Sequence, residues 1–123
     1  MPDLVVEAMK LAPNATVADV GAGTGYFTVR IAKAIPKGQV YAVDIQAEML
    51  TIIRKRREQL NLANVTLVQA RPDNPLLPTE SIDAVLLVDV YHEFSYPYEM
   101  MRALLATLRP GGRLLLSGVP WRG

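Results

Sequence analysis

The stretch Val17-Ala18-Asp19-Val20-Gly21-Ala22-Gly23-Thr24-Gly25-Tyr26 decides the fold, because an apolar run ends there in three alternating glycines. Glycine lets the backbone turn sharply and approach a ligand without a Cβ in the way. A dinucleotide fingerprint would require a third glycine where this chain has Tyr26, which argues against a nucleotide-dependent oxidoreductase. No lysine follows the glycines, as a phosphate-binding P-loop would require. Asp19, two residues before the first glycine, argues for a cationic group beside the turn.

Short elements alternate on both sides of this glycine turn. The residue pattern predicts strands at Thr16–Val20, Gln39–Asp44, Val65–Gln69, Ile82–Asp89 and Arg113–Ser117. It predicts helices at Val5–Leu11, Tyr26–Ile35, Ala47–Leu60 and Tyr98–Leu108. The three prolines within Arg71–Pro78 predict a loop. This alternation predicts an α/β fold of right-handed βαβ units on a mainly parallel, doubly wound sheet, with residues 1–123 as a single domain.

Ligands of such sheets bind beyond the carboxyl ends of the strands. Function is therefore expected in the segments that follow the predicted strands, namely Gly21–Tyr26, Asp44–Gln46, Ala70–Asn74, Asp89–Phe94 and the residues from Ser117 on.

A second acid, Asp44, ends the second predicted strand. At this place a carboxylate accepts hydrogen bonds from both hydroxyls of a ribose. One acid for a cationic group and one for a ribose fit S-adenosylmethionine, which carries an ammonium, a sulfonium and an adenosine. The alternative is structural, with Asp19 capping the turn and Asp44 capping the next helix.

The glycine turn is one of four segments, in order along nearly the whole chain, that together form a recognisable set of motifs. They are Asp19-Val-Gly-Ala-Gly-Thr-Gly25, Tyr41-Ala-Val-Asp-Ile45, the stretch Ser81–Phe94, and Leu108-Arg-Pro-Gly-Gly-Arg-Leu-Leu-Leu116. Together they resemble the class I S-adenosylmethionine-dependent methyltransferases. The resemblance implies five strands in the order 3-2-1-4-5 with helices on both faces of the sheet. It also implies methyl transfer from S-adenosylmethionine to a nucleophilic acceptor.

The resemblance further implies where the cofactor lies. Asp19 and the glycines would face its methionine part, Ile45 would pack on the adenine, and Asp89 would border the methyl-donor end. The implied cofactor-binding residues are Asp19, Gly21, Ala22, Gly23, Tyr26, Asp44, Ile45, Ala70, Arg71 and Asp89. Many members carry an acid after the third strand that bonds the adenine amino group, whereas this chain has Ala70-Arg71. Arginine cannot accept that bond, so we expect the backbone or Asp73 to substitute, or stacking to hold the adenine.

Tyr91 and His92, which follow the fourth predicted strand, are the candidate catalytic residues. His92 is the only histidine and would act as a general base or orienter at the acceptor pocket. The alternative is a histidine at a helix start, bonded to backbone. A lone histidine and the absence of cysteine argue against a metal site.

The charge balance bears on partners and location. Thirteen Lys and Arg against twelve Asp and Glu leave a net charge of +1, which argues against nucleic acid and favours a small-molecule acceptor. The basic run Arg54–Arg57 is read as a solvated helix face, with an RNA-contacting patch as the alternative. We expect no membrane contact and a cytoplasmic domain, because no long apolar segment or signal peptide is visible.

The length of the chain distinguishes it from the family that it resembles. The family core continues with a sixth strand and an antiparallel seventh, whereas this chain ends directly after Arg113–Ser117. The fifth strand would then expose an apolar edge. We expect self-association through this edge, or a truncated core. The alternative function is accordingly a non-catalytic module that binds S-adenosylmethionine or a partner.

Overall fold

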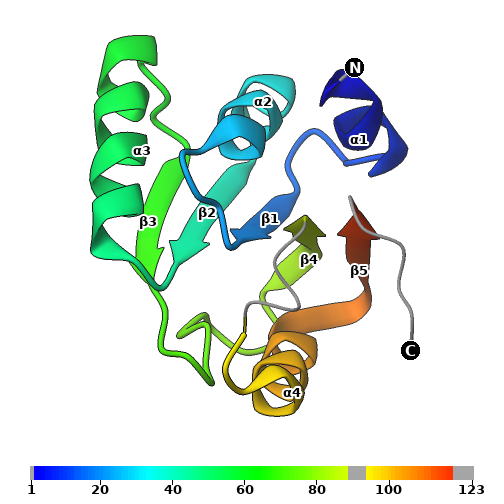
Figure 1. Cartoon of the computed structure of the whole chain (residues 1–123). Helices are drawn as coiled ribbons and strands as arrows, with labels where there is room; N and C mark the ends of the chain where they lie inside the picture. Colours follow the sequence, from blue (N-terminus) through cyan, green and yellow to red (C-terminus); the bar gives the residue numbers. More distant parts are fainter. Residues whose placement is uncertain (1, 89–93, 118–123) are drawn as a thin grey trace.

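The computed structural model describes residues 2–88 and 94–117 (Figure 1). The elements are α1 (Pro2–Ala8), β1 (Thr16–Val20), α2 (Tyr26–Ala34), β2 (Gln39–Asp44), α3 (Ala47–Leu60), β3 (Val65–Gln69), β4 (Ile82–Val88), α4 (Pro97–Thr107) and β5 (Leu108–Ser117). The five strands form one sheet in the order β3-β2-β1-β4-β5, and all four ladders are parallel. The predicted fold class and strand order are confirmed.

Helices cover both faces of the sheet, as predicted (Figure 1). On one face, α2 and α3 bury Ile31 and Ile53 against the sheet, and α1 packs beside α2. On the other face, α4 buries Met100 and Leu104. Fully buried aliphatic side chains each contribute about 1.5–3 kcal/mol relative to exposure, so these two layers supply the main stabilisation. No helix in the described ranges is long and apolar enough to cross a membrane.

Several element boundaries differ from the sequence prediction: α2 ends at Ala34 rather than Ile35, α4 begins at Pro97 rather than Tyr98, and β5 begins at Leu108 rather than Arg113. The first helix spans Pro2–Ala8 rather than Val5–Leu11, because Lys10 takes a left-handed conformation (φ 48°) that ends the helix early. The fourth helix ends at Thr107, and Leu108 is extended and pairs with Ile82 of β4. The pairing with Ile82 places Leu108 in the sheet, and Pro110 disfavours helical backbone at Arg109, so the helix does not continue past this point.

The fifth strand starts with an irregularity. Ile82 and Ala84 of β4 pair with Leu108 and Arg113 of β5, so the β5 segment opposite them is longer. Gly111, at φ 83°, lies in this longer segment with left-handed backbone, a conformation that glycine adopts at little cost.

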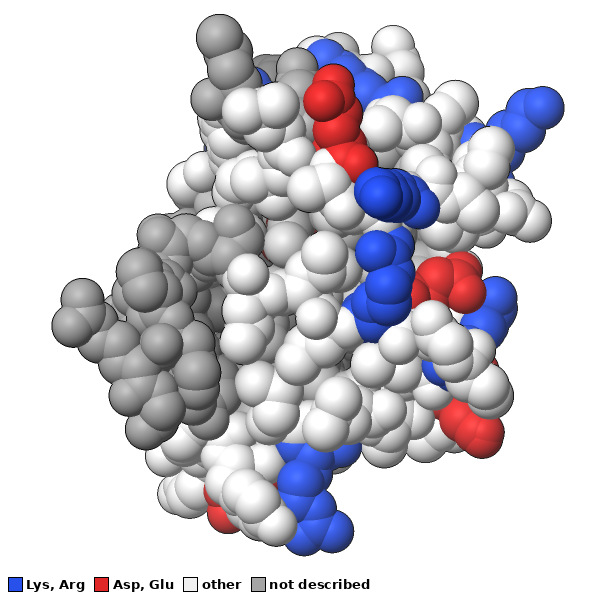
Figure 2. All heavy atoms as spheres, turned by 90° about the vertical axis from the view of Figure 1, so that its right-hand side faces the viewer, with Lys and Arg blue, Asp and Glu red and all other residues white. Residues whose placement is uncertain are grey.

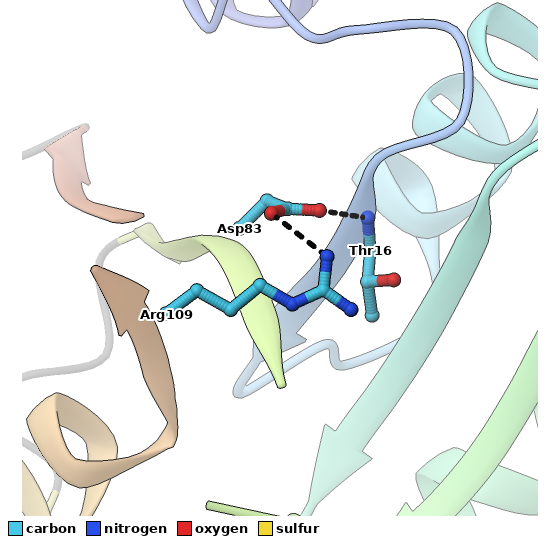
Figure 3. A network of polar contacts seen from close by, with 3 residues as sticks. All are labelled: Thr16, Asp83 and Arg109. Carbon is cyan, nitrogen blue, oxygen red and sulfur yellow. Dashed lines mark hydrogen bonds and ion pairs between the residues drawn. The ribbon is translucent and has the colours of Figure 1, made fainter. Parts of the chain in front are cut away.

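A polar network joins three strands at the end of the sheet where they begin (Figure 3). The Asp83 carboxylate accepts a hydrogen bond from the Thr16 backbone N–H at 2.8 Å and pairs with Arg109 at 3.3 Å. The side chains of Arg109 and Asp83 are 51% and 36% exposed, so the ion pair itself contributes little. The network therefore serves mainly to satisfy the first backbone donor of β1.

The side of the molecule that carries β5 and α1 is shown in Figure 2. Lys and Arg side chains run down it in a broken column, with Asp and Glu beside them. Both signs are present, in agreement with the net charge of +1.

Candidate functional site

A cavity of about 550 Å³ opens at the carboxyl ends of β1, β2 and β4. Its walls come from Val20, Gly21 and Gly23 after β1, Val43, Asp44, Ile45, Gln46 and Met49 along β2 and α3, Ala70 and Pro72 after β3, and Val88, Phe94, Ser95 and Met100 on the β4–α4 side. Among these residues Asp44 is the one with a charged side chain, and most of the others are apolar. The cavity lies where a doubly wound sheet binds its ligand, at the reversal of strand order.

The glycine turn forms one wall of this cavity. Gly21, Gly23 and Gly25 have φ values of 72°, 58° and 88°, all in the left-handed region. The backbone N–H of Gly21 donates to the Val43 carbonyl at 2.8 Å, which joins the turn to β2. A Cβ on Gly25 would lie 2.9 Å from Cγ1 of Ile53, so α3 can pack against the turn only where this side chain is missing. These features explain the alternating glycines.

Asp44 holds the glycine turn from the neighbouring strand. One carboxylate oxygen accepts the backbone N–H of Gly23 at 2.9 Å, and the other accepts that of Gln46 at 2.9 Å. The side chain is half-buried and lines the cavity. Each carboxylate oxygen has two lone-pair sites, so both can accept a further hydrogen bond. The bond from Gln46 at the start of α3 is the one that a structural role of Asp44 predicts. Asp44 also lines the cavity, and its contact with a ribose stays a prediction.

Asp19 lies behind the turn rather than in the cavity wall. Its side chain is 3% exposed and accepts a hydrogen bond from the Thr28 hydroxyl at 2.7 Å. Burial raises the pKa of Asp19 from 3.8 to about 6, against the two hydrogen bonds from Thr28, and the Asp44 charge adds to the rise. Asp19 thus accepts hydrogen bonds from the first turn of α2, as the structural alternative predicts. Gly25, at the N-cap position of α2, makes no side-chain hydrogen bond there. Contact between Asp19 and a cationic group stays a prediction.

Three further predicted residues lie at the edge of the site. Tyr26 begins α2, is 41% exposed, and carries the Arg30 guanidinium over its ring at 3.6 Å. Ala22 is half-buried, and its backbone N–H donates to the Val43 carbonyl at 3.0 Å. Arg71 is exposed and exchanges backbone hydrogen bonds with Asn74. These predicted residues are outside the set that lines the cavity.

The predicted adenine end is built mainly from backbone and apolar side chains. Ile45 and Ala70 line the cavity, as does Pro72 from the loop after β3. The Ala70 backbone N–H donates to the Asp44 carbonyl at 3.0 Å, and the Gln69 side chain donates to the Ile45 carbonyl at 3.1 Å. These bonds fix the backbone on both sides of the cavity mouth.

The predicted residues Asp89, Tyr91 and His92 lie outside the described residues. Sequence reasoning missed Met49, Ser95 and Met100, which line the cavity. Met100 is fully buried, in agreement with the core packing that its helical spacing predicts, and it also reaches the cavity. Pro72 and Gln46 fall within the segments after strands, so that signal could have identified them.

Comparisons with known proteins agree with this arrangement. A family model described as "Methyltransferase domain" matches residues 17–112. An uncharacterized methyltransferase-like protein of Schizosaccharomyces pombe is 32% identical over an alignment of 125 positions, which covers 97% of this chain and 46% of that protein. The ubiquinone/menaquinone biosynthesis C-methyltransferase UbiE of Pseudomonas savastanoi pv. phaseolicola is 34% identical over 102 residues, covering 81% of this chain and 40% of that protein. The chain spans less than half the length of these two relatives.

A solved structure gives the same result. The S-adenosylmethionine-dependent methyltransferase from Aquifex aeolicus superposes with a TM-score of 0.88 at 29% identity, covering 94% of this chain and 62% of that one. The chain belongs to the class I S-adenosylmethionine-dependent methyltransferases.

Proposed function

We propose that this domain binds S-adenosylmethionine at the carboxyl ends of β1, β2 and β4 and directs its methyl group to a small-molecule acceptor. The observation that carries the proposal is the cavity of about 550 Å³ bounded by the glycine turn, with Asp44 as the charged side chain among its described lining residues. A volume of this size suits a nucleoside with a short side chain. Family membership supports the same activity.

The residues present fit the cofactor. Asp44 would accept the ribose hydroxyls, for which its oxygens retain lone pairs beside the bonds from Gly23 and Gln46. Ile45 and Met49 offer apolar surface to the adenine from the start of α3. The backbone at Gly21 and Gly23 carries no Cβ and would lie against the methionine part. Asp19 supplies a negative charge behind that part, where the cofactor carries its ammonium.

The cofactor, when bound, supplies a methyl group already activated by its sulfonium. The work left to the chain is to align the acceptor with the methyl and to exclude water, and positioning of this kind supplies a large part of the acceleration. Val88, Phe94 and Met100 form an apolar wall on the β4–α4 side. His92 and Tyr91, which lie outside the described residues, are proposed from the sequence to orient or deprotonate the acceptor.

The lining favours a small acceptor with little charge. The β4–α4 wall, formed by Val88, Phe94 and Met100, carries no charged side chain among the described lining residues and so favours an apolar acceptor. The name of the relative UbiE refers to a C-methyltransferase of quinone biosynthesis, which is in keeping with an apolar acceptor. We propose a neutral, largely apolar small molecule.

The free side of β5 supports a proposal on assembly. Among the described strands β5 pairs with β4 alone, and Leu116 is 47% exposed. We propose that a second copy of the chain covers this edge, since unpaired strand edges promote association. Light scattering tests this, and a monomer that persists at high protein concentration contradicts it.

Calorimetric titration with S-adenosylhomocysteine and S-adenosylmethionine tests the donor site. We expect binding, and we expect Asp44→Ala to weaken it by about 1–3 kcal/mol because charge-assisted hydrogen bonds are lost. Glu58→Ala, at an exposed acid of α3 outside the cavity lining, is the control. Unchanged affinity in folded Asp44→Ala contradicts the ribose assignment.

Transfer of a labelled methyl group to a panel of neutral aromatic, aliphatic and amine acceptors then tests catalysis. Transfer to one of them establishes the activity. Cofactor binding without transfer to any acceptor favours the non-catalytic alternative.

A further inference from the structure

Thr28 is a buried polar residue beside the proposed site, and the function above does not use it. Its side chain is fully buried in the first turn of α2, and its hydroxyl donates to Asp19 at 2.7 Å. The Thr28 backbone N–H donates to the same carboxylate. Among the described residues, no other hydrogen-bonded pair of side chains is buried on both sides. The pair links the end of β1 to the start of α2, on either side of the glycine turn.

Among the groups around Asp19, Thr28 is the main one that offsets the cost of burying its carboxylate. In the ladders of β1, the register partners of Asp19 are Ala42 on β2 and Leu86 on β4, which provide no polar side chain. Asp44 is the ionisable group whose charge acts on it, and that charge opposes ionisation of Asp19. A carboxylate in such a place is costly unless hydrogen bonds offset the burial. Loss of the hydroxyl would therefore favour the neutral acid.

The charge of Asp19 matters for the nature of the ligand. A buried carboxylate attracts a cation more strongly than an exposed one, because the surrounding protein screens less than water does. Val20 and Gly21, the two residues after Asp19, line the cavity, so the charge lies one layer behind its wall. The neutral acid would exert no such attraction, while the ribose and adenine contacts would be unaffected.

We propose that Thr28 is a positioning residue of the cofactor site, which keeps Asp19 charged and oriented and thereby sets the preference for nucleosides that carry an ammonium group. This inference rests on the proposed function, because it concerns the same cavity. It concerns selectivity between ligands rather than binding as such. Thr28 acts through Asp19 and makes no contact with the cofactor in this proposal.

The test compares two ligands that differ in one group. S-adenosylhomocysteine carries the ammonium, and its des-amino analogue retains the carboxylate, thioether, ribose and adenine. Thr28→Val removes the hydroxyl at nearly constant volume, and Thr28→Ser keeps it. We expect Thr28→Val to lower the preference for S-adenosylhomocysteine by about fivefold at pH 6 and to leave the affinity for the analogue within about twofold, because a further rise of about one unit from a pKa of about 6 lowers the ionised fraction of Asp19 from about one half to about one tenth. Thr28→Ser should restore the preference.

Several outcomes separate the possibilities. Equal weakening of both ligands by Thr28→Val overturns the inference and leaves Thr28 with a structural role. Unchanged affinities overturn it as well. Failure of the wild-type chain to bind either ligand contradicts the proposed function itself. If Thr28→Val does not fold, Thr28→Ala replaces it as the variant without the hydroxyl. The wild-type chain tests the premise independently, because its preference for the ammonium must rise between pH 5 and pH 7.5, and a flat profile overturns the inference.

Discussion

Asp19→Asn is the substitution that tests the electrostatics of the glycine turn most directly. Asparagine has nearly the shape of aspartate, and its side-chain carbonyl can accept the Thr28 hydroxyl as the carboxyl does at 2.7 Å. It does not titrate. Any difference in pH dependence between the wild-type chain and this variant therefore reports the ionisation of Asp19.

The magnitude follows from the burial of the acid. One pKa unit corresponds to about 1.4 kcal/mol, so the rise from 3.8 to about 6 makes ionised Asp19 cost about 3 kcal/mol in the folded protein. Between these two pH values the folded chain holds a proton that the unfolded chain has released. Wild-type stability relative to Asp19→Asn is therefore greatest below pH 4 and falls by about 3 kcal/mol as the pH passes 6.

Urea denaturation followed by far-UV circular dichroism at several pH values between 4 and 7.5 measures this difference. Titrating groups that do not interact with Asp19 contribute equally to both proteins and cancel in the subtraction, which leaves Asp19 and its coupling to Asp44. Asp73→Asn, at an exposed loop position, is the control for removing one carboxylate. A difference that stays constant within about 1 kcal/mol, or that grows in favour of the wild type with rising pH, refutes the assignment of a buried, desolvated acid at this place.

Three further substitutions test the packing around the site and the opposite end of the sheet. Gly25→Ala should destabilise the fold by at least about 1–2 kcal/mol, because the new Cβ meets Ile53 at 2.9 Å and φ is 88°, and thermal unfolding measures the effect. Met100→Ala should cost about 2–5 kcal/mol by leaving a cavity under α4, and it should weaken acceptor selectivity, which competition between acceptors of different size measures. Arg109→Ala should change stability by less than about 1 kcal/mol, since its ion pair with Asp83 is exposed, and a larger loss in urea denaturation would show that the network of Figure 3 is cooperative.

The central part of the fold could be predicted from the sequence because its signals are local. The strands Gln39–Asp44 and Val65–Gln69 and the helix Ala47–Leu60 have the predicted bounds. The first strand ends in an acid, and the helix ends at Asn61, which is left-handed (φ 54°). The boundaries that differ depend on single backbone conformations. Lys10 is left-handed without being glycine, and Leu108 is drawn into the sheet by its pairing with Ile82.

The candidate site divides in the same way. The glycine turn and Asp44 lie directly after strands, so sequence order alone predicted their place. Met100 reaches the cavity from a helix on the other face of the sheet, and its distance from the turn depends on how α4 packs. The spacing of Asp19 to the glycines predicted contact with the cofactor. Its burial behind the glycine turn depends instead on how α2 packs after that turn, which the spacing does not give.

The strand order has a consequence for the continuity of the chain. Residues up to 69 build β1, β2 and β3 on one side of the sheet, residues from 82 build β4 and β5 on the other, and the chain passes between the two halves once, in the segment 70–81. The cavity spans the boundary, with Gly21 and Asp44 from the first half and Met100 from the second. A cut in the connecting segment would give two fragments held by the β1–β4 ladder and bridged by whatever occupies the cavity. A ligand bound in the cavity would contact both halves, so reassembly of the two fragments would report whether the cavity is occupied.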